Sequence, residues 1–202
     1  MPLWTPTENP HARRWMMFVD GENLTIRAQE LAAKRGVSLT PGLNYEQNVF
    51  VWMPGVTPNR FAPTGPVISG PLEGYAIRCY YYTSVVGDEV RLNTVRTSLW
   101  ELGFHPEVFK RDKGSQRSKG VDITLTKDVL SHAYQGNFDV ALLVAGDGDY
   151  VPLVREVKRL GKNVDGMFFD GPGLGLNQEL RLAVDTFHHL DDHFVEKWKA
   201  VP

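Results

Sequence analysis

Short apolar runs and helical patterns alternate along most of the chain, and this alternation constrains the fold more than any other feature. Apolar runs bounded by turns are typical of buried strands, and apolar residues three or four apart are typical of helices. Chains that alternate strand and helix form a parallel sheet covered by helices. We expect strands at Met16–Val19, Tyr75–Val85, Phe104–Phe109, Phe138–Ala145, Val164–Phe169 and Thr186–Leu190. We expect helices at Glu22–Arg35, Glu89–Leu102, Val121–Tyr134, Tyr150–Leu160, Asn177–Val184 and the C-terminal end.

The segment Leu39–Gly74 departs from this alternation, because prolines and glycines recur throughout it. Such residues break helices and central strands, so we expect an insertion with irregular backbone, one hairpin and few residues in the domain core. Its apolar patches, Val49–Trp52 and Val67–Ile68, should be covered by a partner chain, by a second copy of the protein or by the insertion itself. Residues 1–14 are expected to be a lead-in, and residues 15–202 one domain.

Composition limits the classes of function. A net charge of -2 argues against wholesale coating by nucleic acid but leaves room for a local basic patch. The single cysteine, Cys79, excludes an internal disulfide, and its place in an apolar run predicts a buried structural thiol. No apolar run reaches the roughly 18 residues that span a bilayer, so we expect no membrane segment and a cytoplasmic location.

Acidic residues follow the expected strands at the points where ligands bind in open α/β sheets. Asp20 ends the first strand, Asp147 and Asp149 follow Phe138–Ala145, and Asp122 lies at the start of a helix. Each of them alone would be an ordinary helix cap or turn residue. Gathered together, carboxylates repel one another unless a cation offsets them, and oxygen donors without Cys or His favour Mg²⁺ or Mn²⁺.

Several segments, in the same order, resemble motifs of the NYN domains, a branch of the PIN-like nucleases. In one motif Asp is followed three residues later by Asn, a second reads K-G-V-D, a third reads S-G-D-S-D-F, and the closing one reads L-R-x-A-x-D-x-F. The matching segments here are Phe18–Asn23, Lys119–Ile123, Ala145–Tyr150 and Leu180–Phe187. The ordered set is most similar to the LabA-like branch. One departure is Gly148, which stands where the family often has Ser.

The resemblance implies a three-layer α/β fold of the PIN-like type, with a central, mostly parallel sheet. It also implies a metal-dependent endoribonuclease whose substrate is RNA, single-stranded in our interpretation. The residues that it marks as catalytic and metal-binding are Asp20, Asp122, Asp147 and Asp149, with Asn23 beside them. An alternative is a catalytically weak RNA-binding or regulatory module that keeps the fold. A haloacid-dehalogenase type of phosphatase is disfavoured, because Glu22 stands where its D-x-D motif requires Asp.

Basic residues crowd the loop before Asp122, and they are either phosphate contacts or a solvated face. Arg117 and Lys119 are the candidates for substrate binding, together with Asn23. The run His188–His193 lacks zinc-like spacing and is expected to be a surface cluster. Gly171–Gly175 lacks the spacing of a dinucleotide loop and is expected to be a turn bordering the site, with Asp170 as a candidate outer-sphere acid. Asp128 is interpreted as structural.

Overall fold

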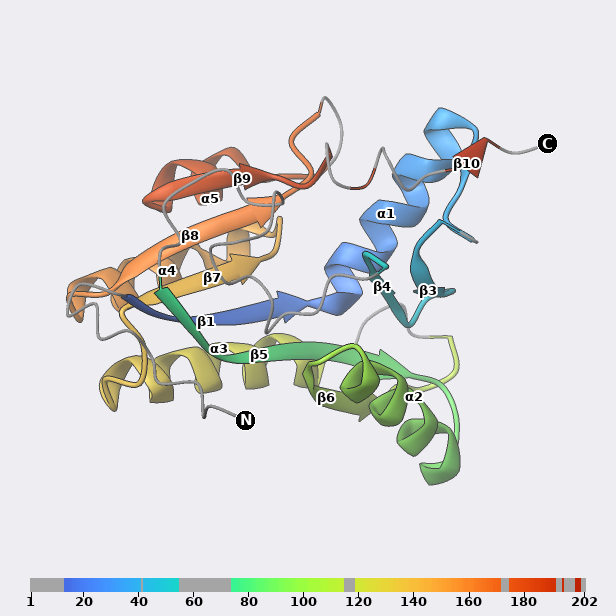
Figure 1. Cartoon of the computed structure of the whole chain (residues 1–202), viewed down its shortest axis with the longest axis horizontal. Coiled ribbons are helices and arrows are strands. Elements are labelled where there is room, and N and C mark those ends of the chain that lie inside the picture. Colours follow the sequence, from blue (N-terminus) through green and yellow to red (C-terminus); the bar gives the residue numbers. More distant parts are fainter. Residues whose placement is uncertain are drawn as a thin grey trace, which may run out of the picture.

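The central sheet consists of parallel strands, as the alternating pattern predicts. The structure is a computed structural model that describes residues 13–40, 42–54, 74–114, 119–171, 175–191, 194 and 199–200. In this part of the chain, six strands are ordered β6-β5-β1-β7-β8-β9 (Figure 1). Their bounds are β1 Arg13–Asp20, β5 Gly74–Val85, β6 His105–Lys110, β7 Val140–Val144, β8 Asn163–Phe168 and β9 Thr186–His189.

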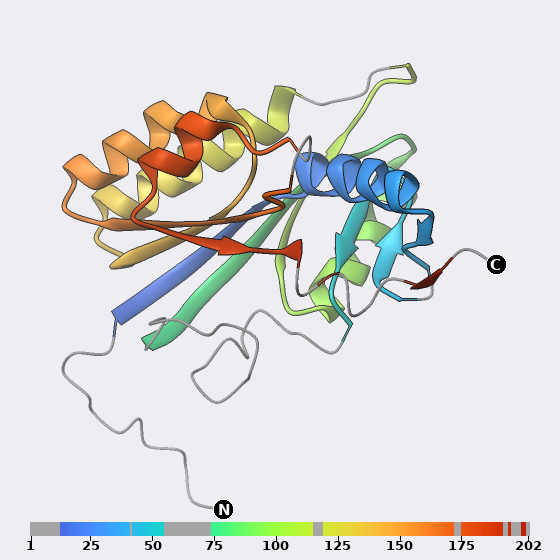
Figure 2. The ribbon, with the colours of Figure 1, turned by 90° about the horizontal axis from the view of Figure 1, so that it is seen from above.

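Helices cover both faces of the sheet, which confirms the three-layer α/β architecture. The helices are α1 Gly21–Arg35, α2 Glu89–Glu101, α3 Lys119–Tyr134, α4 Val151–Arg159 and α5 Gln178–Ala183. Successive side chains of β1 point to opposite faces. Met16 and Phe18 join a cluster with α3 and α4, whereas Met17 and Val19 join a cluster with α1 and α2. Figure 2 shows α3, α4 and α5 gathered along one side of the strands.

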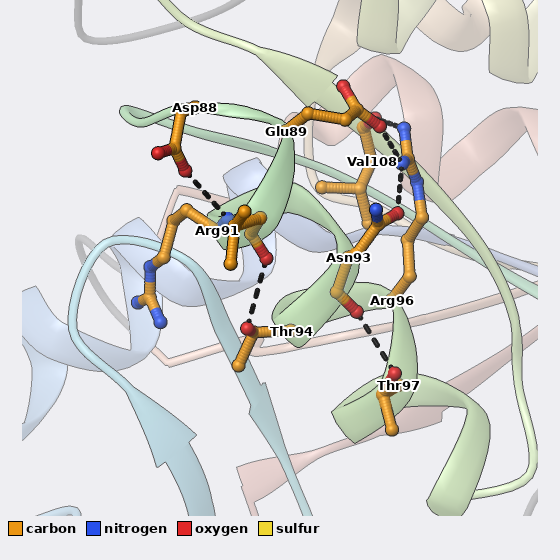
Figure 3. A network of polar contacts seen from close by, with 9 residues as sticks. Asp88, Glu89, Arg91, Asn93, Thr94, Arg96, Thr97 and Val108 are labelled. Carbon is orange, nitrogen blue, oxygen red and sulfur yellow. Dashed lines mark hydrogen bonds and ion pairs between the residues drawn. The ribbon is translucent and has the colours of Figure 1, made fainter.

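Helix α2 is fixed at its start and along its length by local polar contacts (Figure 3). Asp88 caps it by accepting a hydrogen bond from the backbone N–H of Arg91 at 2.9 Å. The guanidinium of Arg96 contacts Glu89 at 2.7 Å and donates to the backbone oxygen of Val108 at 3.2 Å. Because Val108 belongs to β6, Arg96 ties the helix to the edge strand that it covers.

The insertion is only partly as predicted. It forms the expected hairpin, β3 (Asn44–Glu46) with β4 (Phe50–Trp52), which is antiparallel and outside the central sheet. The prediction of few core residues is wrong for its described part, because one patch packs onto the domain and needs no partner chain to cover it. Its buried residues include Leu39, Leu43, Val49, Phe50, Val51, Trp52 and Met53. The ring of Trp52 meets that of Phe104 edge-on at 5.0 Å. Val67–Ile68 lies outside the described residues.

One tyrosine of the central sheet holds this hairpin through hydrogen bonds. The Tyr81 hydroxyl accepts from the backbone N–H of Val51 at 3.1 Å and donates to its carbonyl oxygen at 3.2 Å, fully buried. Tyr81→Phe should therefore lower the free energy of unfolding by about 1–3 kcal/mol, because buried backbone groups lose their partner. Tyr134→Phe is the control, because Tyr134 is 66% exposed and its hydroxyl donates only to the side chain of Glu156 at 3.3 Å, and it should change this free energy by less than about 0.5 kcal/mol. Urea denaturation measures both, and equal effects would contradict the anchoring role.

The C-terminal end agrees with the expected helix at Asp191 and Phe194, which are helical, and differs from it at its last described residues. Lys199–Ala200 forms the short strand β10, which pairs antiparallel with β2, Val37–Ser38, directly after α1. The extended backbone of Lys199–Ala200 is therefore stabilised by hydrogen bonds to β2, and no local sequence pattern predicts this pairing. Among the described helices, none combines the length and the apolar character needed to cross a membrane.

Candidate functional site

Two neighbouring strands bring the first acids to one edge of the sheet. Val19 of β1 lies beside Val144 of β7 in parallel register, so Asp20 and the loop from Ala145 to Asp147 leave the sheet together. Asn23 fastens this arrangement, since its Oδ1 accepts a hydrogen bond from the backbone N–H of Gly146 at 3.0 Å. Asn23 is 3% exposed and thus connects α1 with the loop after β7.

The hydroxyl of Tyr150 connects two of the expected acids. It lies 3.0 Å from Oδ2 of Asp20 and 3.0 Å from Oδ1 of Asp122. Asp20 comes from the end of β1, Asp122 from the first turn of α3, and Tyr150 from the short 3-10 helix η2, Gly148–Tyr150. Three elements that are distant in the sequence therefore meet at one oxygen atom.

The charge of Asp20 is unfavourable at this buried position. Burial raises the pKa of its carboxyl from 3.8 to about 7, and the charges of Asp122 and Glu22 add to this, although hydrogen bonds from Asn23 and Tyr150 oppose it. A phenol has one proton and can donate to only one of two carboxylates. A proton on Asp20 resolves the arrangement, because the carboxyl then donates to Tyr150 while Tyr150 donates to Asp122.

The other two expected acids lie on the loop after β7. Asp147 caps η2 by accepting from the backbone N–H of Asp149 at 3.2 Å, and it lines a pocket shared with Asn23 and Arg27. Asp149 is exposed. Within the described residues, no three His, Cys, Asp or Glu side chains are grouped so that they could hold a metal ion. The structure thus brings Asp20 and Asp122 together, whereas Asp147 and Asp149 stay on the adjoining loop and do not form one group with them.

Oxygen donors suited to a hard cation are nevertheless present at this edge. Asp20 is 3% exposed, and its charged form is disfavoured by burial and by nearby carboxylates. A divalent cation would offset that charge, and carboxylate oxygens are the donors that Mg²⁺ and Mn²⁺ prefer. The chemistry of Asp20 and Asp122 therefore fits such an ion.

Two residues of the site were not singled out from the sequence. Glu22 is 5% exposed, and its carboxylate accepts a hydrogen bond from the hydroxyl of Ser84 on β5. Tyr150 carries the shared hydroxyl. The available signal was its place in the motif Ala145–Tyr150, where the resembling family has Phe. Only the folded chain shows that the additional oxygen lies between two acids.

Gly148, the departure from the family pattern, has a packing reason. A Cβ added there would lie 2.5 Å from Nδ2 and 2.7 Å from Cγ of Asn177, so any side chain would push Asn177 away. The Oδ1 of Asn177 caps α5 by accepting from the backbone N–H groups of Glu179 at 2.8 Å and Leu180 at 3.2 Å. The glycine thus permits the close approach of the capping residue.

Gly148→Ser should lower the free energy of unfolding by about 1–2 kcal/mol, because it displaces the cap of α5. Asn177→Ala should cost about 1 kcal/mol by removing the same cap. If the two act through one contact, the double variant will lose less than the two single losses added together. Urea denaturation of the four proteins measures this, and strict additivity would show that Gly148 acts through something else.

Three residues considered from the sequence, Asp170, Asp128 and His188, have structural partners. Asp170 forms ion pairs with Arg181 at 2.5 Å and His189 at 3.3 Å. Asp128 accepts a hydrogen bond from the Tyr82 hydroxyl at 3.1 Å. His188 is not an open surface residue, since its side chain is 12% exposed and its Nε2 lies 3.5 Å from Asp165.

The basic residues before Asp122 are described only in part. Arg117 and the side chain of Lys119 lie outside the described residues, and the backbone of Lys119 begins α3. The guanidinium of Arg111 donates to the backbone oxygen of Asn48 at 3.1 Å, so it connects the end of β6 with the insertion. Cys79 is fully buried, as expected, and burial raises the pKa of its thiol to about 12.

Comparisons with known proteins agree with this fold. A crystal structure of a protein of unknown function from Vibrio parahaemolyticus is similar, with a TM-score of 0.60 and 21% sequence identity over 95% of this chain and 99% of that one. No protein of curated function matches the chain. The family model of the NYN domain matches residues 14–191, which is most of the sequence. The chain therefore belongs to the NYN domain family.

Proposed function

We propose that the chain is a metal-dependent endoribonuclease that hydrolyses phosphodiester bonds of single-stranded RNA. NYN domains are PIN-like, a class that suggests a nuclease and generally depends on divalent metal. The observation that carries the proposal is the convergence of Asp20 and Asp122 on the hydroxyl of Tyr150 at the carboxyl edge of the sheet. Within the family, the ordered motifs favour the LabA-like branch.

Each residue has a proposed part in the reaction. Asp20 and Asp122, with Asp147 and Asp149 from the adjoining loop, would hold the cation. When bound, Mg²⁺ or Mn²⁺ would activate water and neutralise charge on the phosphate. Asn23 keeps the loop after β7 in place through Gly146, and its amide borders the pocket beside Asp147. Arg117 and Lys119, which precede Asp122 in the sequence, would contact substrate phosphates.

A second candidate function is an RNA-binding or regulatory module that does little chemistry. The observation in its favour is that Tyr150 already satisfies both Asp20 and Asp122. An arrangement in which two carboxyls share a proton and a phenol is stable without a cation. The two candidates therefore differ in whether a divalent ion displaces that proton.

Cleavage of labelled single-stranded RNA tests the proposal. The purified protein should cut in Mg²⁺ or Mn²⁺ and stop cutting when a chelator is added. Ions should also stabilise the protein against heat, because a ligand that binds only the folded state raises its melting temperature. RNA binding without cleavage, across several RNA sequences and both ions, would support the regulatory module instead.

A further inference from the structure

A pocket of about 290 Å³ opens beside the acids, between α1, the loop after β7 and the segment before α5. Its lining includes Arg27 from α1, Asp147 from the loop after β7, and Gly175 and Asn177 from the segment before α5. The lining exposes mainly polar atoms rather than apolar ones. A cleft of this kind suits a small charged group better than an apolar ligand.

Glycines form the pocket wall where side chains would collide. A Cβ on Gly146 would lie 2.3 Å from the ring of Phe168, and one on Gly175 would lie 2.3 Å from Nε of Arg27. Gly175 also has φ +84°, a conformation that side chains disfavour. Gly175 thus lets the guanidinium of Arg27 lie directly against backbone, and Gly148 does the same for the amide of Asn177.

Arg27 lines the pocket although one of its buried N–H groups has no hydrogen-bond acceptor among the described residues. Its Nη1 donates to Glu30 at 2.7 Å, but its Nε is buried and has no acceptor among the described residues. A buried donor without a partner is unfavourable, so fold stability alone gives no reason for this placement. About a third of the side chain stays exposed, at 30%, which leaves the guanidinium within reach of a ligand.

We propose that this pocket binds a phosphate group of the RNA strand adjacent to the scissile one, with Arg27 as its main ligand. The inference rests on the proposed ribonuclease function and names a contact that the sequence motifs do not mark. A guanidinium binds phosphate oxygens through a planar fork of donors. Asp147 lines the same pocket and repels a phosphate, so the attraction has to come from Arg27.

The amide of Asn177 contributes a second donor. Its Oδ1 is engaged by the backbone N–H groups of Glu179 and Leu180, so the atom that it turns toward Gly148 is the donor Nδ2. The pocket thus combines one cation with the amides of Asn177 and Asn23, beside the acids that would hold the metal.

Binding of a fluorescein-labelled ten-nucleotide oligouridylate tests the inference, measured by anisotropy in EDTA so that no cleavage occurs. Arg27→Ala should bind about 10- to 100-fold more weakly than the wild type, as for loss of a charged hydrogen bond. The slope of log affinity against log salt should fall by about 0.7, the value for one phosphate contact on a single strand. Arg14→Ala, the control, removes the same charge at the opposite edge, where Arg14 pairs with Asp139.

The fold of the variants can be checked independently. Alanine is the best helix former, so α1 should survive Arg27→Ala, and circular dichroism will confirm it. Arg27→Lys keeps the charge and the aliphatic stem but loses the fork, and it should bind with intermediate affinity. In Mg²⁺, the Arg27→Ala variant should show a raised KM with kcat nearly unchanged, because the contact is made equally in the ground state.

The outcomes separate the two proposals. If Arg27→Ala binds the oligonucleotide as well as Arg14→Ala does, or if the wild type does not bind it, the phosphate pocket is wrong. That result does not contradict the proposed cleavage of RNA by the wild type, which is measured separately in Mg²⁺ or Mn²⁺. If the wild type never cleaves RNA with either ion but Arg27→Ala loses binding, the nuclease proposal fails and the phosphate pocket stands.

Discussion

Asp20→Asn should reduce kcat/KM for RNA cleavage by about 10²- to 10³-fold while leaving the fold intact. The variant removes a buried negative charge that would hold the cation, and a catalytic ion supplies several kcal/mol at about 1.36 kcal/mol per tenfold in rate. The asparagine can keep the hydrogen bonds. Its Oδ1 can accept from the N–H of Asn23, and its Nδ2 can donate to Tyr150, whose proton then goes to Asp122.

A matched control separates this effect from a general loss of charge. Asp139→Asn changes the same groups at the opposite edge of the sheet, where Asp139 pairs with Arg14 at 2.8 Å. It should leave kcat/KM within a few-fold of the wild type. Steady-state cleavage in Mg²⁺ measures both variants. Cleavage by Asp20→Asn at the rate of the wild type would show that the acids on Tyr150 do not form the active site.

The metal-free protein should lose stability as pH rises from about 4 to about 8. Burial raises the pKa of Asp20 to about 7 in the folded state, above its ordinary value of 3.8. The folded state therefore holds this proton more tightly than the unfolded state, so the stabilisation is complete below pH 3.8 and is lost as pH rises through 7. At about 1.36 kcal/mol per pKa unit, the loss from this one group is on the order of 4 kcal/mol.

Comparison with the Asp20→Asn variant separates the contribution of Asp20 to the pH dependence of stability from those of other titratable groups. Burial lowers the pKa of His105 and His132, and the hydrogen bond and charge of Arg14 lower the pKa of Asp139, so other groups also change stability with pH. They cancel when the free energy of unfolding of Asp20→Asn is subtracted from that of the wild type at each pH. Urea titrations in EDTA give this difference, which should fall from about pH 4 to about pH 7 and stay level at higher pH. A difference that stays constant would mean that Asp20 is already charged in the metal-free protein.

Saturating Mg²⁺ should flatten this pH dependence in the wild type alone. A cation that binds the charged carboxylate lowers the proton affinity of Asp20, so metal binding and proton release are linked. The regulatory module predicts the opposite, with the same pH dependence in Mg²⁺ and in EDTA. The stability measurement thus tests whether a divalent ion binds at Asp20, without any cleavage assay.

Local sequence patterns were sufficient to predict the strands of the sheet and the helices that cover it, because strand and helix periodicity can be recognised within a few neighbouring residues. Buried strands such as β7 read as continuous apolar runs, and α1 shows helical spacing that stops at Gly36, whose φ of +61° suits glycine. The parallel order then follows from the alternation of the elements, and it places Asp20 and Asp147 at one edge. The motif resemblance to the NYN family was likewise readable from ordered residues.

Tertiary structure alone decided how the insertion packs on the domain and that the chain ends in strand β10. Prolines and glycines predicted irregular backbone correctly, but they carry no information about Trp52 packing on Phe104 or Tyr81 binding Val51. The pairing of β10 with β2 depends on residues more than a hundred positions apart. Such contacts arise from the shape of the folded core, which local propensity does not encode.

The chemistry of the site divides in the same way. The sequence by itself determined which residue types stand at the strand ends and at the start of α3, and these indicate the family and the candidate acids Asp20, Asp122, Asp147 and Asp149. Only the tertiary structure decided that Tyr150 lies between two of them, that Gly148 makes room for Asn177, and that Arg27 faces the pocket. The physical reason is that motifs fix the order of groups along the chain. Distances between side chains, burial and the resulting pKa of Asp20 exist only after the elements have packed.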